Sequence, residues 1–270
     1  HGKSFLMSLL ALTASGLIAL GFNSTPLLAT AEYADFSTRG QSELKLNIDG
    51  SPKEQSTGLD YNYITEYSYG IFESLNLIVP RIQGGGSSED LGTHHGIYDF
   101  LIRNGVGPSQ ASRFTKNVPT YWGNQPILEA PAYIGITVFF FALFGFILSK
   151  GPMRNSLIFG TLLSLLLSMG KNVPIVTDFF IYNFPFYNKF RAVSSIQVIL
   201  EICLPLSASI GLYHLFYNDE NLKFNRFLKI AIIPIVLLLV VFLSKEMLSF
   251  NGINDSYLRE IYGSDLFLKI

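Results

Sequence analysis

Apolar stretches with few charged side chains recur along the chain, and five of them approach the length of a membrane-spanning helix. Such a helix takes about 20 mostly apolar residues, with some tolerance from tilt. The sequence predicts transmembrane helices over residues 1–31, 130–149, 155–170, 193–217 and 227–250. The expected fold class is therefore an all-α polytopic membrane protein with about five transmembrane helices. The last four of them form a membrane domain over residues 130–270.

The segments between these stretches have a different composition. Residues 32–129 form one large loop, and its glycine- and serine-rich centre from Gly84 to Ser88 predicts a flexible hinge. Residues 171–192 are crowded with Phe and Tyr but interrupted by Pro174 and Pro185, so they are too broken to span a membrane. This pattern predicts an interfacial or re-entrant aromatic segment.

Lysine and arginine residues in short connections predict how the chain is oriented, because positively charged loops stay in the cytoplasm. Six of them fall on one predicted side: Lys3, Lys150, Arg154, Lys223, Arg226 and Lys229. Three fall on the opposite side: Lys171, Lys189 and Arg191. The large loop 32–129 shares that second side, so we expect it to be extracytoplasmic.

Composition agrees with a membrane protein. It excludes a nucleic-acid-binding protein and a protein built on disulfides or a cysteine metal cluster. Charged residues make up 14% of the chain, against about 25% in ordinary soluble domains. The net charge of -1 excludes the basic surface of a nucleic-acid-binding protein. Cys203 is the single cysteine, so neither an internal disulfide nor a cysteine metal cluster can form. Because the sequence opens at His1 without Met and stops just after an amphipathic stretch, we expect a fragment truncated at both ends.

Several strings along the chain are more specific than a generic membrane helix. They are Ala31-Glu32-Tyr33, Ser37-Thr38-Arg39-Gly40, Tyr67-Ser68-Tyr69-Gly70 continuing through Glu73 to Val79-Pro80, Gly84-Gly85, Tyr121-Trp122-Gly123-Asn124-Gln125-Pro126, Gly170-Lys171-Asn172 and Tyr187-Asn188-Lys189-Phe190-Arg191-Ala192-Val193. In this order and spacing they resemble the YfhO-like family of bacterial membrane proteins, and members from Bacteroidota most of all. The resemblance covers essentially the whole chain.

This resemblance implies a membrane glycosyltransferase of the GT-C type. Such an enzyme takes a sugar from a polyprenyl-phosphate carrier outside the bacterial cytoplasmic (inner) membrane, for glycosylation of cell-envelope glycans or lipids. The resemblance puts the catalytic acid in a first extracytoplasmic loop upstream of these residues, so the catalytic residue within the chain is unknown. The implied partners are the lipid bilayer and the polyprenyl-linked sugar, which is the donor substrate, and no further cofactor is expected.

Two other functions fit the same sequence. The first is a transporter or flippase of lipid-linked intermediates, and the second is a non-catalytic membrane subunit of an envelope complex. An acidic residue at the start of an upstream extracytoplasmic loop would favour the enzyme.

Three cations are candidates for binding the carrier's phosphate, because a phosphate leaving group needs its charge offset. Arg191 and Lys189 stand at the predicted outer end of the fourth helix, behind the aromatic segment, and Arg39 follows the first helix. The alternative is that all three are interfacial anchors that contact ordinary lipid headgroups.

Other polar residues are candidates for lining a cavity. Glu201 would lie about 15 Å along the fourth helix from Arg191, and a carboxylate at that depth should face protein or water. Ser194, Gln197 and Glu201 share one helical face at spacings of three and four. The alternative is a protonated Glu201 carboxyl that bonds a neighbouring helix. Glu32 could face the same cavity, or could pair with Arg39 for structural reasons.

No metal site is expected. The adjacent His94 and His95 lie in a glycine- and serine-rich region near Glu89, Asp90 and Asp99, but nothing in the sequence fixes a ligand geometry there.

Overall fold

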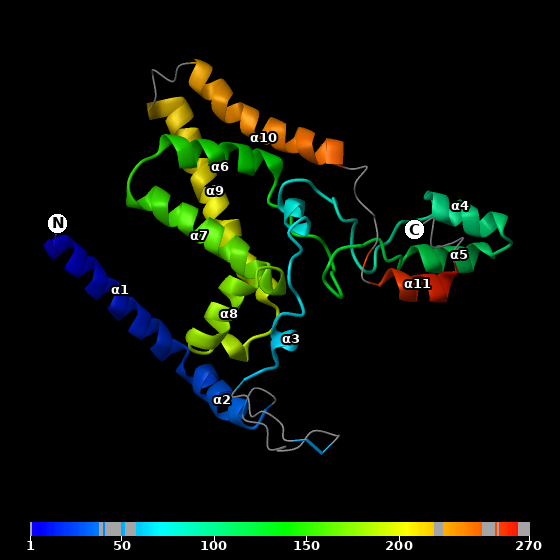
Figure 1. Ribbon diagram of the computed structural model, residues 1–270, viewed down its shortest axis with the longest axis horizontal. Coiled ribbons are helices and arrows are strands. Elements are labelled where there is room, and N and C mark those ends of the chain that lie inside the picture. The colour runs from blue at the N-terminus through cyan, green and yellow to red at the C-terminus, as the bar shows by residue number, and fades with distance from the viewer. Residues whose placement is uncertain are drawn as a thin grey trace. The chain divides into compact units, whose positions relative to one another are not determined.

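The computed structural model describes residues 2–37, 40, 50, 51, 58–218, 224–244, 252 and 254–263. Within these residues every regular element is a helix, and no strand is present (Figure 1). The chain divides into two compact units, one of residues 1–64 with 185–191 and the other of residues 65–184 with 192–270. The expected all-helical class is confirmed.

The first unit contains the first predicted membrane helix, which is broken into two helices. Helix α1 (Gly2–Phe22) carries only exposed side chains, and α2 (Ser24–Asp35) follows it directly. The break lies at Asn23, whose side-chain amide donates to the Ala19 carbonyl at 2.9 Å and so satisfies a carbonyl near the end of α1. Pro26 is tolerated in the first turn of α2, where its missing N–H would have no helical acceptor.

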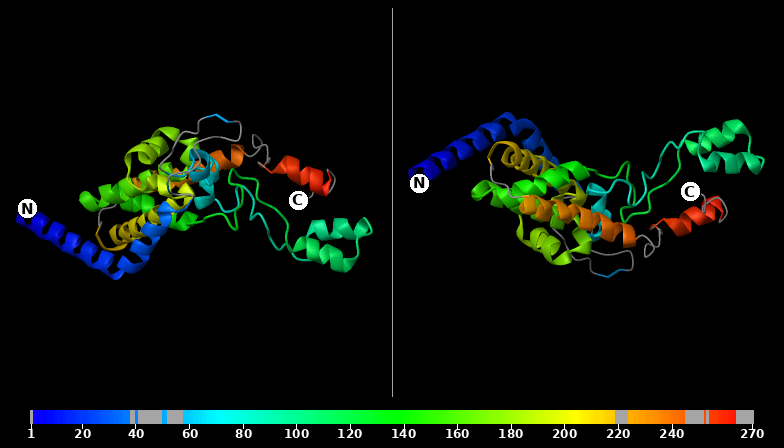
Figure 2. Two further views of the ribbon diagram at one scale, coloured as in Figure 1. Left: turned by 90° about the horizontal axis from the view of Figure 1, so that it is seen from below. Right: turned by 90° about the horizontal axis from the view of Figure 1, so that it is seen from above.

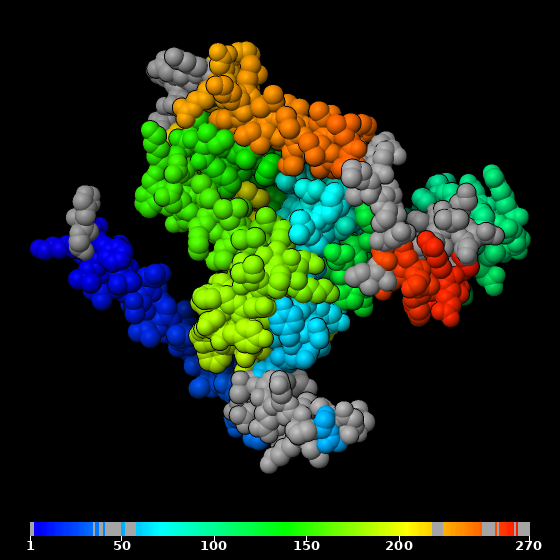
Figure 3. Space-filling view, in the orientation of Figure 1, coloured from blue at the N-terminus to red at the C-terminus, as the bar shows by residue number. Residues whose placement is uncertain are grey.

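Four apolar helices of the second unit pack together. They are α6 (Ile136–Leu148), α7 (Pro152–Ser168), α9 (Gln197–Tyr213) and α10 (Phe224–Ser244). Helix α9 contacts both α6 and α7, and α10 lies against α6 (Figures 1 and 3). Leu200, Leu204 and Ala208 of α9 are buried in one cluster with Ala142 of α6 and Leu77 of the large loop.

Small residues let α6 and α9 approach closely. A Cβ atom on Gly145 would lie 1.9 Å from the Ser207 carbonyl oxygen, and one on Gly211 would lie 2.2 Å from the Phe141 carbonyl oxygen. The Ser207 hydroxyl also donates to the Ala142 carbonyl at 3.0 Å. Small residues four apart, here Ser207 and Gly211, are the usual means of bringing two helix backbones together in a membrane.

Three described helices are long and apolar enough to cross a membrane: Lys3–Phe22, Val193–Tyr217 and Phe224–Ser244. The second of these joins the 3-10 turn η4 (Val193–Ile196), α9 and the π-helical turn η5 (His214–Asn218). Its limits agree with the predicted 193–217. The protein is therefore a helical membrane protein, while α7, at 17 residues, lies at the lower limit for spanning.

The helix predicted over residues 130–149 is shorter than expected. It begins only at Ile136, because Gly135 has a φ of 109° and cannot continue the preceding chain as a helix. The backbone amides of Ile134 and Gly135 both donate to the Leu77 carbonyl, at 3.1 and 3.2 Å. The absence of charge in this stretch misled the prediction, since an uncharged segment can also form irregular chain whose backbone bonds to other parts of the protein.

The large loop contains regular structure of its own. Helices α4 (Gly96–Arg103) and α5 (Pro108–Thr115) lie side by side (Figure 2) and bury Ile97, Leu101 and Ala111 with Val118. The side chain of His95 caps α4 by accepting from the Ile97 amide. Upstream of these helices are the short helix α3 (Tyr61–Ile64), which belongs to the first unit, and the 3-10 turn η1 (Glu73–Leu77).

The glycine-rich centre of the loop is packed, so the predicted flexible hinge is wrong. The Ser87 amide donates to the Leu128 carbonyl at 2.7 Å, and the Thr120 amide donates to the Gly86 carbonyl at 3.0 Å. Gly84 has a φ of 83°, and a Cβ atom there would lie 1.9 Å from the Thr120 carbonyl oxygen. The glycines therefore permit a close backbone contact, which composition alone does not distinguish from flexibility.

The aromatic segment is too interrupted to span, as predicted. It forms the 3-10 turn η2 (Gly170–Asn172), the ten-residue helix α8 (Pro174–Asn183) and the 3-10 turn η3 (Tyr187–Lys189). Three large apolar side chains of α8 are exposed: Ile175, Phe179 and Tyr182. Near the end of the chain, α11 (Asp255–Tyr262) is a short helix with charged residues.

Candidate functional site

A fully buried carboxylate stands at the start of η1. Glu73 has no exposed surface, although a buried charge is costly unless it is paired or hydrogen-bonded. The backbone amides of Gly70 and Asn124 donate to its Oε2 at 3.0 and 3.3 Å. The Gln125 side-chain amide donates to Oε1 at 3.0 Å, and the Tyr121 hydroxyl donates to the same oxygen. These four donors satisfy the carboxylate and tie η1 to the segment before α6.

A polar pocket of about 240 Å³ lies beside this network, at the N-terminal end of α9. Residues of the large loop, of the irregular chain before α6, of η4 and of α9 surround it. Its lining consists of Tyr69, Gln125, Leu128, Ala132, Ser194, Ser195, Gln197, Val198 and Glu201. Gln125 belongs to both features, because its side-chain amide donates to Glu73 and the residue also lines the pocket.

The structure brings three of the predicted polar residues together. Ser194, Gln197 and Glu201 all line the polar pocket. Gln197 is buried and donates to the Ser168 hydroxyl of α7 at 3.3 Å. Glu201 is exposed, and within the described residues its carboxyl makes no hydrogen bond to a neighbouring helix. Its carboxyl is thus available to a molecule in the pocket.

The two tyrosines of this region remain protonated donors at neutral pH. Burial, and then the nearby Glu73 carboxylate, raise the pKa of Tyr69. Burial, and then the hydrogen bond to Glu73, raise the pKa of Tyr121 still further. The pocket therefore presents a phenol, two hydroxyls, two carboxamides and one carboxylate, a mixture of donors and acceptors that suits a polyhydroxyl ligand.

Arg191 lies in the first unit, where it contacts Tyr63. Its guanidinium carbon stands 4.4 Å from the centre of the Tyr63 ring, and Nη1 donates to the Tyr63 hydroxyl at 3.2 Å. A cation over an aromatic face is an electrostatic contact that fixes the plane of the guanidinium. In the same unit the Leu59 amide donates to the Asn188 carbonyl at 3.0 Å, which connects the segment of Arg191 to the one before α3.

The other predicted site residues are less informative. Lys189 is half-buried in η3 of the first unit. Glu32 is exposed in α2. Arg39 lies outside the described residues.

Sequence reasoning missed Glu73 as a site residue. The signal was an acid within an otherwise apolar and aromatic run, at residues 67–80. That signal is weak, since only the fold brings Tyr121 and Gln125, about fifty residues later, onto its carboxylate.

Among the residues that the structure describes, no group of three or more His, Cys, Asp or Glu side chains could hold a metal ion. Comparison of the chain with protein-family models, with curated proteins and with solved structures found no match.

Proposed function

We propose that this protein is a membrane glycosyltransferase of the GT-C type, and that its polar pocket binds the sugar of a polyprenyl-phosphate donor. The observation that carries this proposal is the composition of the pocket among apolar helices. Six of its nine lining residues are polar, and none of them is a cation. A volume of about 240 Å³ lies below the range of about 300–1,000 Å³ typical of drug-sized ligands, so it suits one sugar ring rather than a whole lipid.

The carrier's phosphate needs a cation, and Arg191 is the candidate. It precedes Ser194 of the pocket by three residues in the sequence. Stacking on Tyr63 orients the guanidinium, and a planar fork of donors matches phosphate oxygens in a way that an ammonium does not. We assign no catalytic base to the residues of this chain.

The proposal includes a topology in the bacterial cytoplasmic membrane. The chain crosses five times: through α1 with α2, through α6 together with the extended residues before it, and through α7, α9 and α10. Residues 32–129 and the aromatic segment 171–192 are then extracytoplasmic, and the polar pocket opens on that side. The bias of lysine and arginine among the short connections supports this orientation.

One observation favours a transporter of lipid-linked intermediates as a second candidate. The Glu201 carboxyl lies on an apolar helix and lines the pocket, and ionisable groups in such helices often mark substrate or proton pathways. In that case Glu201 would couple movement of the substrate to a proton.

Sugar transfer by the full-length protein in liposomes, from a radiolabelled polyprenyl-phosphate donor, tests the proposal. We expect Glu201→Gln to lower transfer about tenfold, the loss of one charge-assisted hydrogen bond to a sugar hydroxyl. Asp99→Asn is the matched control, because it neutralises a carboxylate on α4, away from the pocket, and should leave transfer unchanged.

Two results would overturn the assignment. If the wild-type protein transfers no sugar while it moves the donor lipid across the membrane, it is a transporter. If Glu201→Gln transfers sugar as fast as the wild-type protein, the pocket does not bind the sugar through this carboxylate.

A further inference from the structure

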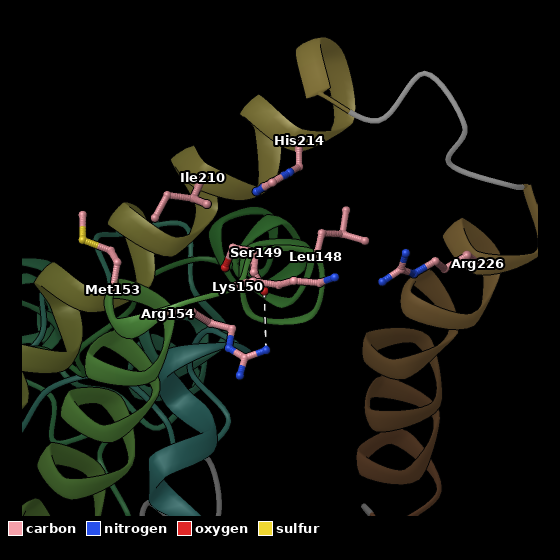
Figure 4. A pocket seen from close by; sticks show the side chains of 8 residues that line it. All are labelled: Leu148, Ser149, Lys150, Met153, Arg154, Ile210, His214 and Arg226. Carbon is pink, nitrogen blue, oxygen red and sulfur yellow. Dashed lines mark hydrogen bonds between the residues drawn. The ribbon is translucent and has the colours of Figure 1, made fainter. Parts of the chain in front are cut away.

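A second and larger pocket lies at the opposite end of α9. It has a volume of about 560 Å³, within the range of small-molecule sites. The ends of four helices surround it: the C-termini of α6 and α9 and the N-termini of α7 and α10 (Figure 4). The lining residues are Leu148, Ser149, Lys150, Met153, Arg154, Ile210, His214 and Arg226. We call it the cationic pocket.

Basic side chains from the connection between α6 and α7, from α7 and from α10 converge on the cationic pocket, and none of its described lining residues is acidic. Lys150 and Arg226 point toward each other from opposite sides, while His214 reaches in from η5, which continues α9 (Figure 4). Like charges brought together repel, so the arrangement is favourable only when an anion or abundant water offsets the charge.

One of these cations is held in place by the fold. Nη1 of Arg154 donates to the Ser149 carbonyl at 3.4 Å, and Nε and Nη2 donate to the Asn155 side-chain oxygen at 3.1 and 2.9 Å. Within the described part of the chain, the side chains of Lys150 and Arg226 make no hydrogen bond or ion pair. Arg154 is thus positioned in advance, and the other two cations can still contact a ligand.

We propose that the cationic pocket binds a phosphomonoester, and that its occupant is the headgroup of an anionic membrane lipid. Several cations around one hollow match a phosphate with up to two negative charges better than they match a single carboxylate. Arginine supplies paired donors to phosphate oxygens, and lysine supplies a point charge. Leu148, Met153 and Ile210 form the apolar part of the lining, where the first atoms of an acyl chain would lie. Basic pockets between membrane helices bind lipid phosphates by this combination.

The proposal does not depend on the function proposed for the polar pocket. Gln197 and His214 stand 17 residues apart along α9 and η5, so the two pockets are separated by about 25 Å of helix. Cations that merely anchor a protein at the headgroups need no common hollow, because each side chain reaches the interface independently.

The test is a titration of the detergent-solubilised full-length protein with phosphatidic acid, followed by native mass spectrometry. We expect saturable binding, and Arg226→Gln should weaken it about tenfold, as expected for loss of a charge-assisted hydrogen bond. Lys229→Gln is the matched control, since it removes one positive charge from the same exposed side of α10 and does not line the pocket. This control should bind as the wild-type protein does.

A second arm separates the sources of phosphate. Inorganic phosphate at millimolar concentration should fail to displace phosphatidic acid if the acyl chain contributes. If inorganic phosphate displaces phosphatidic acid, and does so less well in Arg226→Gln, the pocket is still a phosphate site, with a soluble ligand as its occupant. Equal affinity of Arg226→Gln and Lys229→Gln for phosphatidic acid, or no saturable binding of either probe, would overturn the proposal.

Discussion

The hydroxyl of Tyr121 donates a hydrogen bond to the carboxylate of Glu73, and both side chains are buried although they stand 48 residues apart in the chain. The same hydroxyl oxygen accepts from the backbone amide of Gln125 at 2.9 Å. One phenol therefore satisfies two buried groups from two distant segments. It connects η1 to the chain that leads into α6.

Tyr121→Phe should lower the free energy of unfolding by about 1–3 kcal/mol, because it leaves a buried carboxylate and a buried amide each short of a partner. Thermal unfolding of the full-length protein in detergent measures this. Tyr98→Phe removes a hydroxyl from α4 outside the network and should change stability by less than about 0.5 kcal/mol. Equal effects of the two substitutions would contradict the importance of the Glu73 network.

Gly84→Ala should destabilise the protein more than Gly92→Ala does. Both glycines have positive φ, of 83° and 68°, which costs an alanine about 1–2 kcal/mol. Only at Gly84 would the new Cβ also meet backbone, at 1.9 Å from the Thr120 carbonyl oxygen, whereas no atom lies within 4 Å at Gly92. The difference between the two unfolding temperatures measures the close contact alone. A flexible hinge at Gly84 would predict no difference.

Lowering the pH should lower the stability of the large loop, because the carboxylate of Glu89 becomes protonated. Arg81 donates to both oxygens of its carboxylate, at 2.5 and 2.9 Å, and this hydrogen bonding holds the pKa of Glu89 below its ordinary value of 4.5. A depressed pKa in the folded protein stabilises it above pH 4.5, and the stabilisation is lost as the pH falls through the lower, folded value. Because Arg81 is largely exposed, the effect is at most about 1 kcal/mol.

Arg81→Gln should remove that dependence on acid. The comparison is the unfolding temperature of the wild-type and variant proteins at about pH 6 and about pH 3.5. The two proteins should differ at the higher pH and converge at the lower one. A constant difference would mean that Glu89 does not contribute through its charge.

Arg191→Lys should lower sugar transfer about tenfold while expression and unfolding temperature stay unchanged, since lysine keeps the charge but loses the fork that binds phosphate. Lys171→Arg, another exchange of one cation for another in the same aromatic segment, should transfer normally. Wild-type transfer by Arg191→Lys would leave Arg191 as an interfacial anchor stacked on Tyr63.

Cysteine labelling should place Ser88 and Asn155 on opposite sides of the membrane. Both residues are exposed, and the native Cys203 is buried and can be replaced by serine beforehand. A membrane-impermeant maleimide added from outside should label Ser88→Cys and not Asn155→Cys. The reverse result would invert the proposed orientation, and labelling of both would reduce the number of crossings.

Much of the helical architecture could be predicted because long apolar stretches leave the backbone few alternatives in a membrane. The limits of α9 with its flanking turns followed from the sequence in this way. The start of α6 did not, because it depends on Gly135 and on the Leu77 carbonyl, which is remote in the sequence. The buried network around Glu73 could not be predicted for the same reason, since nothing in the sequence near Glu73 indicates which residues will donate to its carboxylate.

The shortness of α6 has a consequence for biosynthesis. Its 13 residues rise about 20 Å, less than the hydrocarbon core of about 30 Å. Gly145 of α6 lies against Ser207 of α9, which is 62 positions further along the chain. On the proposed topology, α6 leaves the ribosome before α9, the helix that packs against it. We therefore expect α6 to insert stably only after α9 has been synthesised, so the order of membrane integration should differ from the order of translation.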